Sequence, residues 1–183
     1  MMELGKIEVE IEGLSPLLMH HCNPEDLIKT AKKKIQTYDV KEMANKHAYW
    51  KNNGKKELCV PSHCIYAMLL EGAKPFRQNR MSVANLIAGS IRVEPEEIGL
   101  GTDKYEIDVR PVVIQNNRVL QARPKLKNWK LNFEIIYHKE YISPDVLKKI
   151  ITDSGFRVGL LSYRPQKKGP FGTFKLNKFE VIE

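Results

Sequence analysis

Two segments of the chain alternate apolar and polar residues, and this pattern constrains the fold more than any other feature. Lys6–Glu12 places Ile7, Val9 and Ile11 between charged residues, and Trp129–Tyr137 repeats the alternation. Successive side chains of a strand point to opposite faces, so a period of two indicates a strand with one buried face. Both segments are therefore predicted as half-buried strands.

Helical spacing appears between the strands. Apolar residues at intervals of three and four predict one helix from Ser62 to about Pro75 and another that Ser143-Pro144-Asp145 opens, with Gly155 as its C′ residue. Asn116-Asn117 joins two further strands as a tight hairpin. The two hairpin strands are predicted at Tyr105–Ile114 and Arg118–Ala122, and the closing strand at Phe174–Ile182. A short helix at Ser82–Ala88 and a short strand at Ile91–Val93 are also predicted.

The order of these elements predicts an α+β fold. Strand, helix, two or three strands, helix and strand make the ferredoxin-like arrangement β-α-β-β-α-β, an antiparallel sheet with both helices on one face. The 183 residues fit a single domain, 1–183. A lysine-rich helical insertion, at about 24–57, follows the first strand, with helices predicted at Pro24–Lys34 and Asp39–Trp50.

The positive charge is concentrated in three blocks. Nine lysines stand between Lys29 and Lys56 against two acids, whereas Arg118–Lys130 has five cations and Gly155–Lys178 six, neither with an acid. Because the whole chain carries only +8, its remainder is acidic. Such segregation indicates a surface that faces a polyanion, and we expect single-stranded RNA or DNA as the partner.

The three blocks supply the candidate binding residues. Cations neutralise phosphates, exposed aromatic rings stack on unpaired bases, and glycines let backbone N–H groups approach phosphate oxygens. Trp129 and Phe174 are assigned instead to the core. The predicted nucleic-acid contacts are Lys32, Lys33, Lys34, Arg118, Arg123, Lys125, Lys127, Arg157, Tyr163, Arg164, Lys167, Lys168, Gly169, Phe171 and Gly172.

Two other readings of the sequence stay open. His20 and His21, which follow the first strand, have the chemistry for metal-independent cleavage of RNA, because histidine titrates near neutrality. Alternatively, the basic surface docks an acidic protein.

Metal and cofactor sites are not predicted. The sequence lacks the ligand spacing of a structural zinc site except at Cys59-x₄-Cys64, and Asp26 and Asp39 have no identified partners for a hydrolytic metal. No apolar run has the roughly 18 residues of a membrane helix, and the N-terminus lacks targeting features. We expect a cytosolic protein with reduced cysteines.

Three segments carry a resemblance to a known family. IEVEIEGLSPLLMH (7–20) resembles the strand and G-x-(T/S)-P-L turn that open members of the CRISPR-associated RAMP superfamily. ELCVPSHCIYAMLLEGAK (57–74) is similar to the family's entry into its first core helix, although His63 and Cys64 stand where serines are usual. GLLSYRPQKKGPFGTFKL (159–176) resembles its C-terminal glycine-rich loop.

The resemblance implies a role in antiviral defence as a guide-RNA-binding subunit. By layout the chain is most similar to the backbone subunits that tile along a CRISPR guide RNA, in which the insertion helps to grip RNA. Self-association along nucleic acid, or assembly with other effector subunits, is the expectation that follows.

Overall fold

The computed structural model describes residues 3–22, 39–51, 56–78, 80–114 and 117–182. Its main sheet has four strands in the order β11 (Phe174–Ile182), β1 (Leu4–Gly13), β10 (Lys130–His138) and β6 (Ile91–Glu94), and all neighbours are antiparallel. The prediction of an α+β fold with an antiparallel sheet is confirmed.

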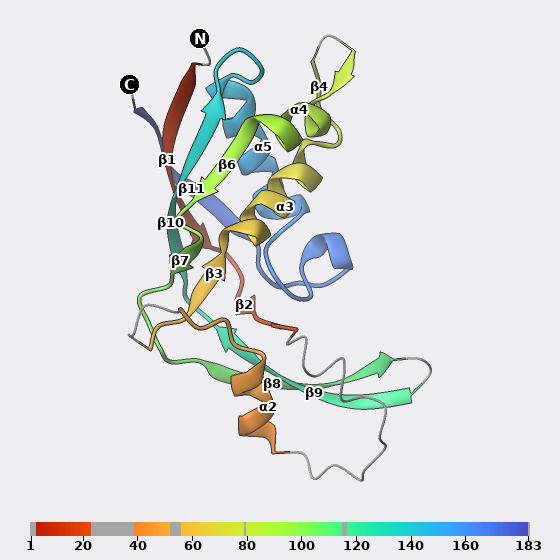
Figure 1. The fold of residues 1–183 in the computed structure, drawn as a ribbon. Coiled ribbons are helices and arrows are strands. Elements are labelled where there is room, and N and C mark those ends of the chain that lie inside the picture. Colours follow the sequence, from red (N-terminus) through yellow and green to blue (C-terminus); the bar gives the residue numbers. More distant parts are fainter. Residues whose placement is uncertain (1–2, 23–38, 52–55, 79, 115–116, 183) are drawn as a thin grey trace.

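Three helices cover one face of this sheet (Figure 1). The three helices are α3 (Ser62–Ala73), α4 (Val83–Ser90) and α5 (Pro144–Arg157), and α3 contacts both of the others. The alternating residues of β1 and β10 bury their apolar side chains beneath these helices, and each such side chain contributes about 1.5–3 kcal/mol. Buried residues of these two strands include Ile7, Val9, Ile11, Leu131, Phe133 and Ile135.

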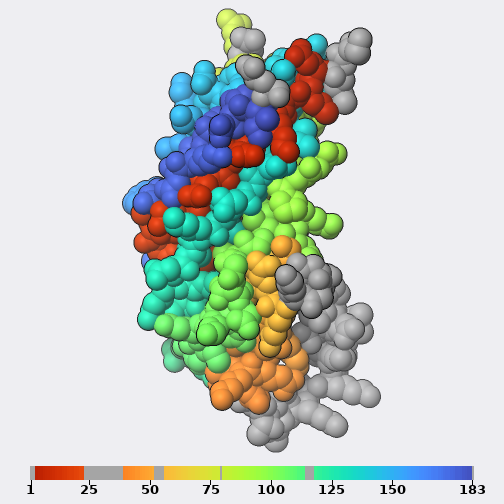
Figure 2. Space-filling view, turned by 90° about the vertical axis from the view of Figure 1, so that its left-hand side faces the viewer, coloured from red at the N-terminus to blue at the C-terminus, as the bar shows by residue number. Residues whose placement is uncertain are grey.

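No helix of the described residues covers the opposite face of the main sheet. Figure 2 shows β11, β1, β10 and β6 lying side by side on this face of the molecule. The polar residues of the alternation lie here, including Lys6 and Glu8 of β1 and Glu134 of β10. We call this surface the open sheet face.

The predicted hairpin forms a separate sheet, which corrects its assignment to the main one. β8 (Glu106–Ile114) and β9 (Asn117–Leu126) pair with each other, and β9 also pairs with β2 (Leu17–Leu18). Hence the weakly predicted segment 91–93, as β6, fills the edge position of the main sheet. The alternation of apolar and polar residues predicts that these segments are strands, but it does not predict which sheet they join.

Only part of the predicted insertion lies within the described residues. The helix expected at Asp39–Trp50 is the shorter α2 (Val40–Lys46), and Asp39 caps it by accepting from the backbone N–H groups of Lys41 and Glu42 at 2.9 and 3.1 Å. α2 packs on β9. The helix predicted at Pro24–Lys34 falls outside the described ranges.

Short elements complete the fold. β3 (Cys59–Pro61) pairs with β7 (Glu97–Gly99), β4 (Arg77–Gln78) pairs with β5 (Met81–Ser82), and a 3₁₀ turn, η1 (Pro165–Lys167), follows α5. No helix among the described residues is long and apolar enough to cross a bilayer.

The end of α5 corrects the position of its C′ glycine. The helix continues through Gly155 to Arg157, and Gly159, with φ of +70°, takes the left-handed C′ conformation and donates its N–H to the Ser154 carbonyl at 2.8 Å. Gly155 is buried, and a Cβ there would collide with the backbone of Phe174. Position 155 therefore needs a glycine for close packing against the closing strand rather than for a turn.

Candidate nucleic-acid interface

The terminal loop, residues 159–173, is fixed by the turn that follows β1. Ser15 Oγ lies 3.0 Å from the backbone nitrogen of Thr173, whose N–H it accepts, and 2.8 Å from Thr173 Oγ1. Nearby, the N–H of Gly172 donates to the Pro16 carbonyl and that of Ser162 to the Leu18 carbonyl, each at 2.9 Å. Two segments more than 140 residues apart in the sequence thus form one structural unit.

The backbone of the terminal loop is unusual. Leu161, Tyr163 and Lys168 have φ of 57°, 52° and 59°, and Gly159 and Gly172 have φ of 70° and 71°. Left-handed conformations are uncommon outside glycine and cluster at binding and active sites, where the surrounding structure holds them. The conformation therefore marks this loop as a candidate functional element.

The two glycines predicted to face phosphate instead shape the loop. The Gly169 N–H donates to the Arg164 carbonyl at 3.0 Å, and the Gly172 N–H donates to the Pro16 carbonyl. A Cβ at Gly169 or Gly172 would overlap the backbone of Tyr163 or Leu160, respectively. The prediction that their N–H groups meet phosphate is corrected, because those groups are already hydrogen-bonded.

The predicted cations Arg164, Lys167 and Lys168 stand together on this loop. Arg164 donates to the Leu161 carbonyl at 2.7 Å and to Gln166 Oε1 at 3.0 Å, which holds its guanidinium in place without neutralising it. No carboxylate of the described residues lies within ion-pair distance of any of the three cations, and both lysines are exposed. They form a surface with uncompensated positive charge.

The hairpin adds a guanidinium and two rings. Arg110 Nε lies 3.0 and 2.9 Å from the two carboxylate oxygens of Asp108, and its guanidinium lies 5.0 Å from the Phe171 ring centre and 6.0 Å from that of Tyr163. Tyr163 is 40% exposed, whereas Phe171 is 6% exposed. Tyr163 is the ring that is free to stack on a base, and Phe171 supports it.

Arg123 has a structural position rather than an exposed one. It is only 7% exposed, stands opposite Asp108 in the hairpin register, and donates from Nη1 to Ser162 Oγ at 3.1 Å. Burial lowers the pKa of its guanidinium, and Asp108 opposes that shift. Its predicted direct contact with phosphate is corrected, because the side chain joins the hairpin to the terminal loop.

The structure separates the other predicted cations from this surface. Arg157 pairs with Asp153 and donates to the Gly72 carbonyl at 2.8 Å, so it ties α5 to α3. Lys125 and Lys127 both pair with Glu106, at 3.2 and 2.7 Å. Arg118 is exposed on the hairpin. Lys32, Lys33 and Lys34 fall outside the described residues.

The two candidate catalytic histidines are packed against other rings. His20 stacks on His47 with ring centres 4.5 Å apart, and His21 lies 4.9 Å from Tyr49. Burial, with the charges of His47 and Arg123, lowers the pKa of His20 to about 4. A group that stays neutral near pH 7 is a weak base. With this pKa, His20 is poorly matched to general acid–base cleavage near neutral pH.

The three cysteines are free thiols, and all of them lie near enough to Tyr49 to affect its pKa, which burial raises. Burial raises the pKa of the Cys59 and Cys64 thiols to about 11, which favours the protonated form, and Cys22 is exposed. Within the described ranges no three His, Cys, Asp or Glu side chains are placed to hold a metal ion. Asp39 serves as the cap of α2, and Asp26 lies outside those ranges.

The open sheet face also carries lysines, but its electrostatic character differs from that of the terminal loop. Hydrogen bonds to Glu180 and Glu8 hold the pKa of Lys178 above its ordinary value, and those from Asn177 and Lys175 lower the pKa of Glu12. The ion pairs of this face are Lys6–Glu134, Arg92–Glu94, Lys130–Glu12, Lys175–Glu12, Lys178–Glu8 and Lys178–Glu180. Its cations are therefore compensated.

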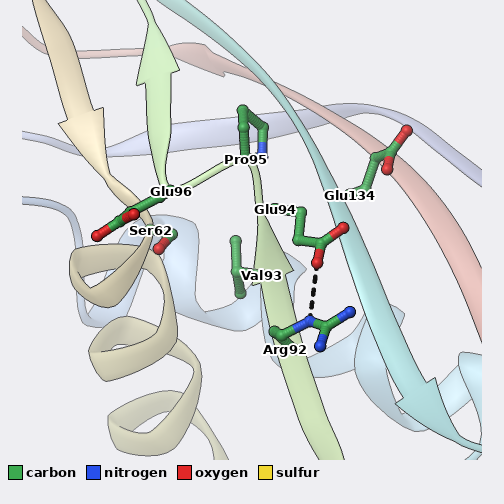
Figure 3. Close-up of a pocket in the computed structure, with 7 residues that line it drawn as sticks. All are labelled: Ser62, Arg92, Val93, Glu94, Pro95, Glu96 and Glu134. Carbon is green, nitrogen blue, oxygen red and sulfur yellow. Dashed lines mark ion pairs between the residues drawn. The ribbon is translucent and has the colours of Figure 1, made fainter. Parts of the chain in front are cut away.

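A surface hollow lies at the β6 edge of this face. It has a volume of about 780 Å³, and Figure 3 shows Glu94, Glu96 and Glu134 around it with Arg92 paired to Glu94 at 2.8 Å. Glu94 is paired with Arg92 and Glu134 with Lys6, so the lining offers no unpaired cation to a phosphate, and Glu96 adds a negative charge. This hollow is not a candidate for nucleic acid.

Sequence reasoning missed several residues of the interface. Arg110 and Asp108 lie in the predicted strand 105–114, and the hairpin register places them on the same face as Arg123; the alternation could have revealed this. Tyr49, and His47 behind His20, carried no signal, because they come near the terminal loop only through tertiary packing. Ser162 lies within that loop but has no charge or ring that marks it.

Comparisons with known proteins place the fold. No family model and no curated protein matches the sequence. Among solved structures, a chain in the cryo-EM structure of the type III-B Cmr-beta bound to cognate target RNA matches with a TM-score of 0.62 and 16% identity. The match covers 99% of this chain and 61% of that one, so this chain spans about three fifths of its length. The protein thus has a fold similar to that of a chain of a Cmr-beta complex.

Proposed function

We propose that the protein binds single-stranded RNA across the terminal loop and the adjoining face of the hairpin, as a RAMP-like subunit. The observation that carries the proposal is the cluster of Arg164, Lys167 and Lys168, whose charges are not compensated by any described carboxylate, beside the exposed ring of Tyr163. Cations for phosphates and a ring for a base are the two contacts that unpaired strands require.

The fold supports the same proposal. The sheet order β11-β1-β10-β6, with α3 and α5 in its two crossover connections, agrees with a ferredoxin-like β-α-β-β-α-β unit. The matched Cmr-beta structure contains target RNA. We therefore favour RNA over single-stranded DNA, and we further propose that the protein works within an assembly of several subunits.

Filter binding over a salt series tests the RNA proposal. Each neutralised phosphate of a single strand contributes about 0.7 to the slope of log affinity against log salt, so Arg164→Gln/Lys167→Gln/Lys168→Gln lowers that slope by roughly 2. The matched control, Lys6→Gln/Lys130→Gln/Lys178→Gln, removes the same charge from the open sheet face and keeps the wild-type slope.

Two outcomes contradict the proposal. One is no binding of single-stranded RNA by the wild type at low salt, and binding to an acidic protein in that case favours a docking module. The other is an equal loss of slope in the two triple variants, which makes the effect one of net charge. A sizing column with and without RNA tests assembly, and an unchanged monomer in both runs argues against it.

A further inference from the structure

A second, smaller hollow adjoins the terminal loop. It has a volume of about 330 Å³, near the lower end of the roughly 300–1,000 Å³ usual for small-molecule sites. Segments from four parts of the chain meet there. We call it the histidine pocket, and its lining residues are His20, Tyr49, Cys64, Leu161, Ser162, Tyr163, Arg164 and Lys167.

Three of the eight lining residues of the histidine pocket, His20, Tyr49 and Tyr163, carry flat rings. His20 is backed by the stacked ring of His47, and the Tyr49 hydroxyl donates to the His20 carbonyl at 3.4 Å, which fixes the two segments together. Tyr163 forms another wall from the terminal loop. Flat aromatic surfaces with polar edges are the surroundings in which proteins hold single bases.

Polar groups are present at two positions of the pocket. Ser162 Oγ accepts a hydrogen bond from Arg123, so its own hydrogen is left to donate to a ligand. Lys167 supplies an ammonium group at the terminal loop.

We propose that the histidine pocket binds one nucleotide, with the base against His20, Tyr49 and Tyr163 and the phosphate at Lys167. The inference deepens the proposed function: an RNA strand that crosses the terminal loop places one of its bases here. A bare phosphate suits the site less well, because the rings contribute nothing to it.

The protonation state of His20 agrees with a base as the ligand. Its pKa of about 4 keeps the ring neutral at pH 7. A neutral imidazole has one N–H donor and one acceptor nitrogen, the two functions that the edge of a nucleobase also presents.

Titration with mononucleotides tests the pocket without any RNA strand. The probes are AMP, GMP, CMP and UMP, with ribose 5-phosphate as the control that lacks a base, and the readout is the ring-proton NMR signal of His20, assigned with His20→Gln. At least one mononucleotide shifts this signal saturably, and ribose 5-phosphate does not. Lys167→Gln weakens that binding at least about fivefold, because it removes the cation that meets the phosphate. The control variant Lys149→Gln, which removes the same charge from α5 outside the pocket lining, leaves it unchanged.

The outcomes separate the two proposals. If RNA binds but no mononucleotide moves the His20 signal, the pocket inference is wrong and the proposed function stands. Equal binding of ribose 5-phosphate makes the site a phosphate site and also overturns the inference. A loss shared by Lys167→Gln and Lys149→Gln makes the effect one of net charge and contradicts the assigned place of the phosphate. Mononucleotide binding without RNA binding supports the pocket and contradicts the proposed function.

Discussion

The open sheet face and the terminal loop are both rich in lysine, yet they differ in how that charge is compensated. On the sheet face each cation named above lies beside a glutamate, as Lys6 does beside Glu134 at 2.8 Å. On the terminal loop, Lys167 and Lys168 have no carboxylate of the described residues within reach. The comparison teaches that pairing, more than the number of lysines, separates a solvated surface from one suited to a polyanion.

Charge reversal on the terminal loop is expected to have the largest effect. Lys167→Glu/Lys168→Glu replaces attraction by repulsion where phosphates are proposed to lie, and lowers affinity for single-stranded RNA on the order of 100-fold at low salt. Lys148→Glu/Lys149→Glu, an equal reversal on α5, changes the affinity by less than about threefold. Filter binding measures both, and similar losses would show that only net charge matters.

Releasing the lysines of the open sheet face is expected to create a second basic surface. Glu8→Gln/Glu12→Gln/Glu134→Gln removes the partners of Lys6, Lys130 and Lys175 and one of the two partners of Lys178, and raises RNA affinity on the order of tenfold at low salt.

The control for this variant neutralises the same number of acids elsewhere. Asp103→Asn/Glu140→Gln/Asp145→Asn changes carboxylates that make no ion pair with another described residue. Equal gains in the two triple variants would mean that pairing on the sheet face does not hide its lysines.

Arg110 and Arg92 give a matched test of a single guanidinium. Arg110→Lys loses the two-oxygen contact with Asp108 and the ring contacts with Phe171 and Tyr163, so RNA affinity falls about threefold and the free energy of unfolding by about 1 kcal/mol. Arg92→Lys changes a guanidinium paired with Glu94 on the open sheet face and leaves RNA binding unaltered. Filter binding and urea unfolding are measured for both variants. A wild-type affinity in Arg110→Lys would show that this hairpin residue does not contribute to the RNA interface.

The smallest expected effect is the pH dependence of His20. Because its pKa is about 4 in the folded protein and about 6.5 when unfolded, the unfolded chain binds more protons between these values, and stability falls as the pH is lowered from 6.5 to 4. His20→Gln reduces that fall and leaves the stability above pH 7 with the same slope as in the wild type. Urea unfolding at several pH values checks this, and identical curves would show that His20 is not held neutral.

Several local features were predictable because their causes lie within a few residues. The alternation in Lys6–Glu12 and Trp129–Tyr137 predicted β1 and β10, and the helical spacing predicted α3 and α5. Trp129 and Phe174 were assigned to the core, and they are 5% and 2% exposed. The basic character of the terminal loop was also visible.

The sequence by itself determined the alternating strands, the helices between them and the uneven distribution of charge, because side-chain periodicity and composition are local properties. Only the tertiary structure decided that the hairpin leaves the main sheet, that Arg123 and Phe171 are buried, and that His20, Ser162 and Lys167 line one pocket. The physical reason is that burial and ion pairing depend on which distant residues come within a few ångströms, and a lysine carries the same charge in the sequence whether or not a glutamate faces it in the fold.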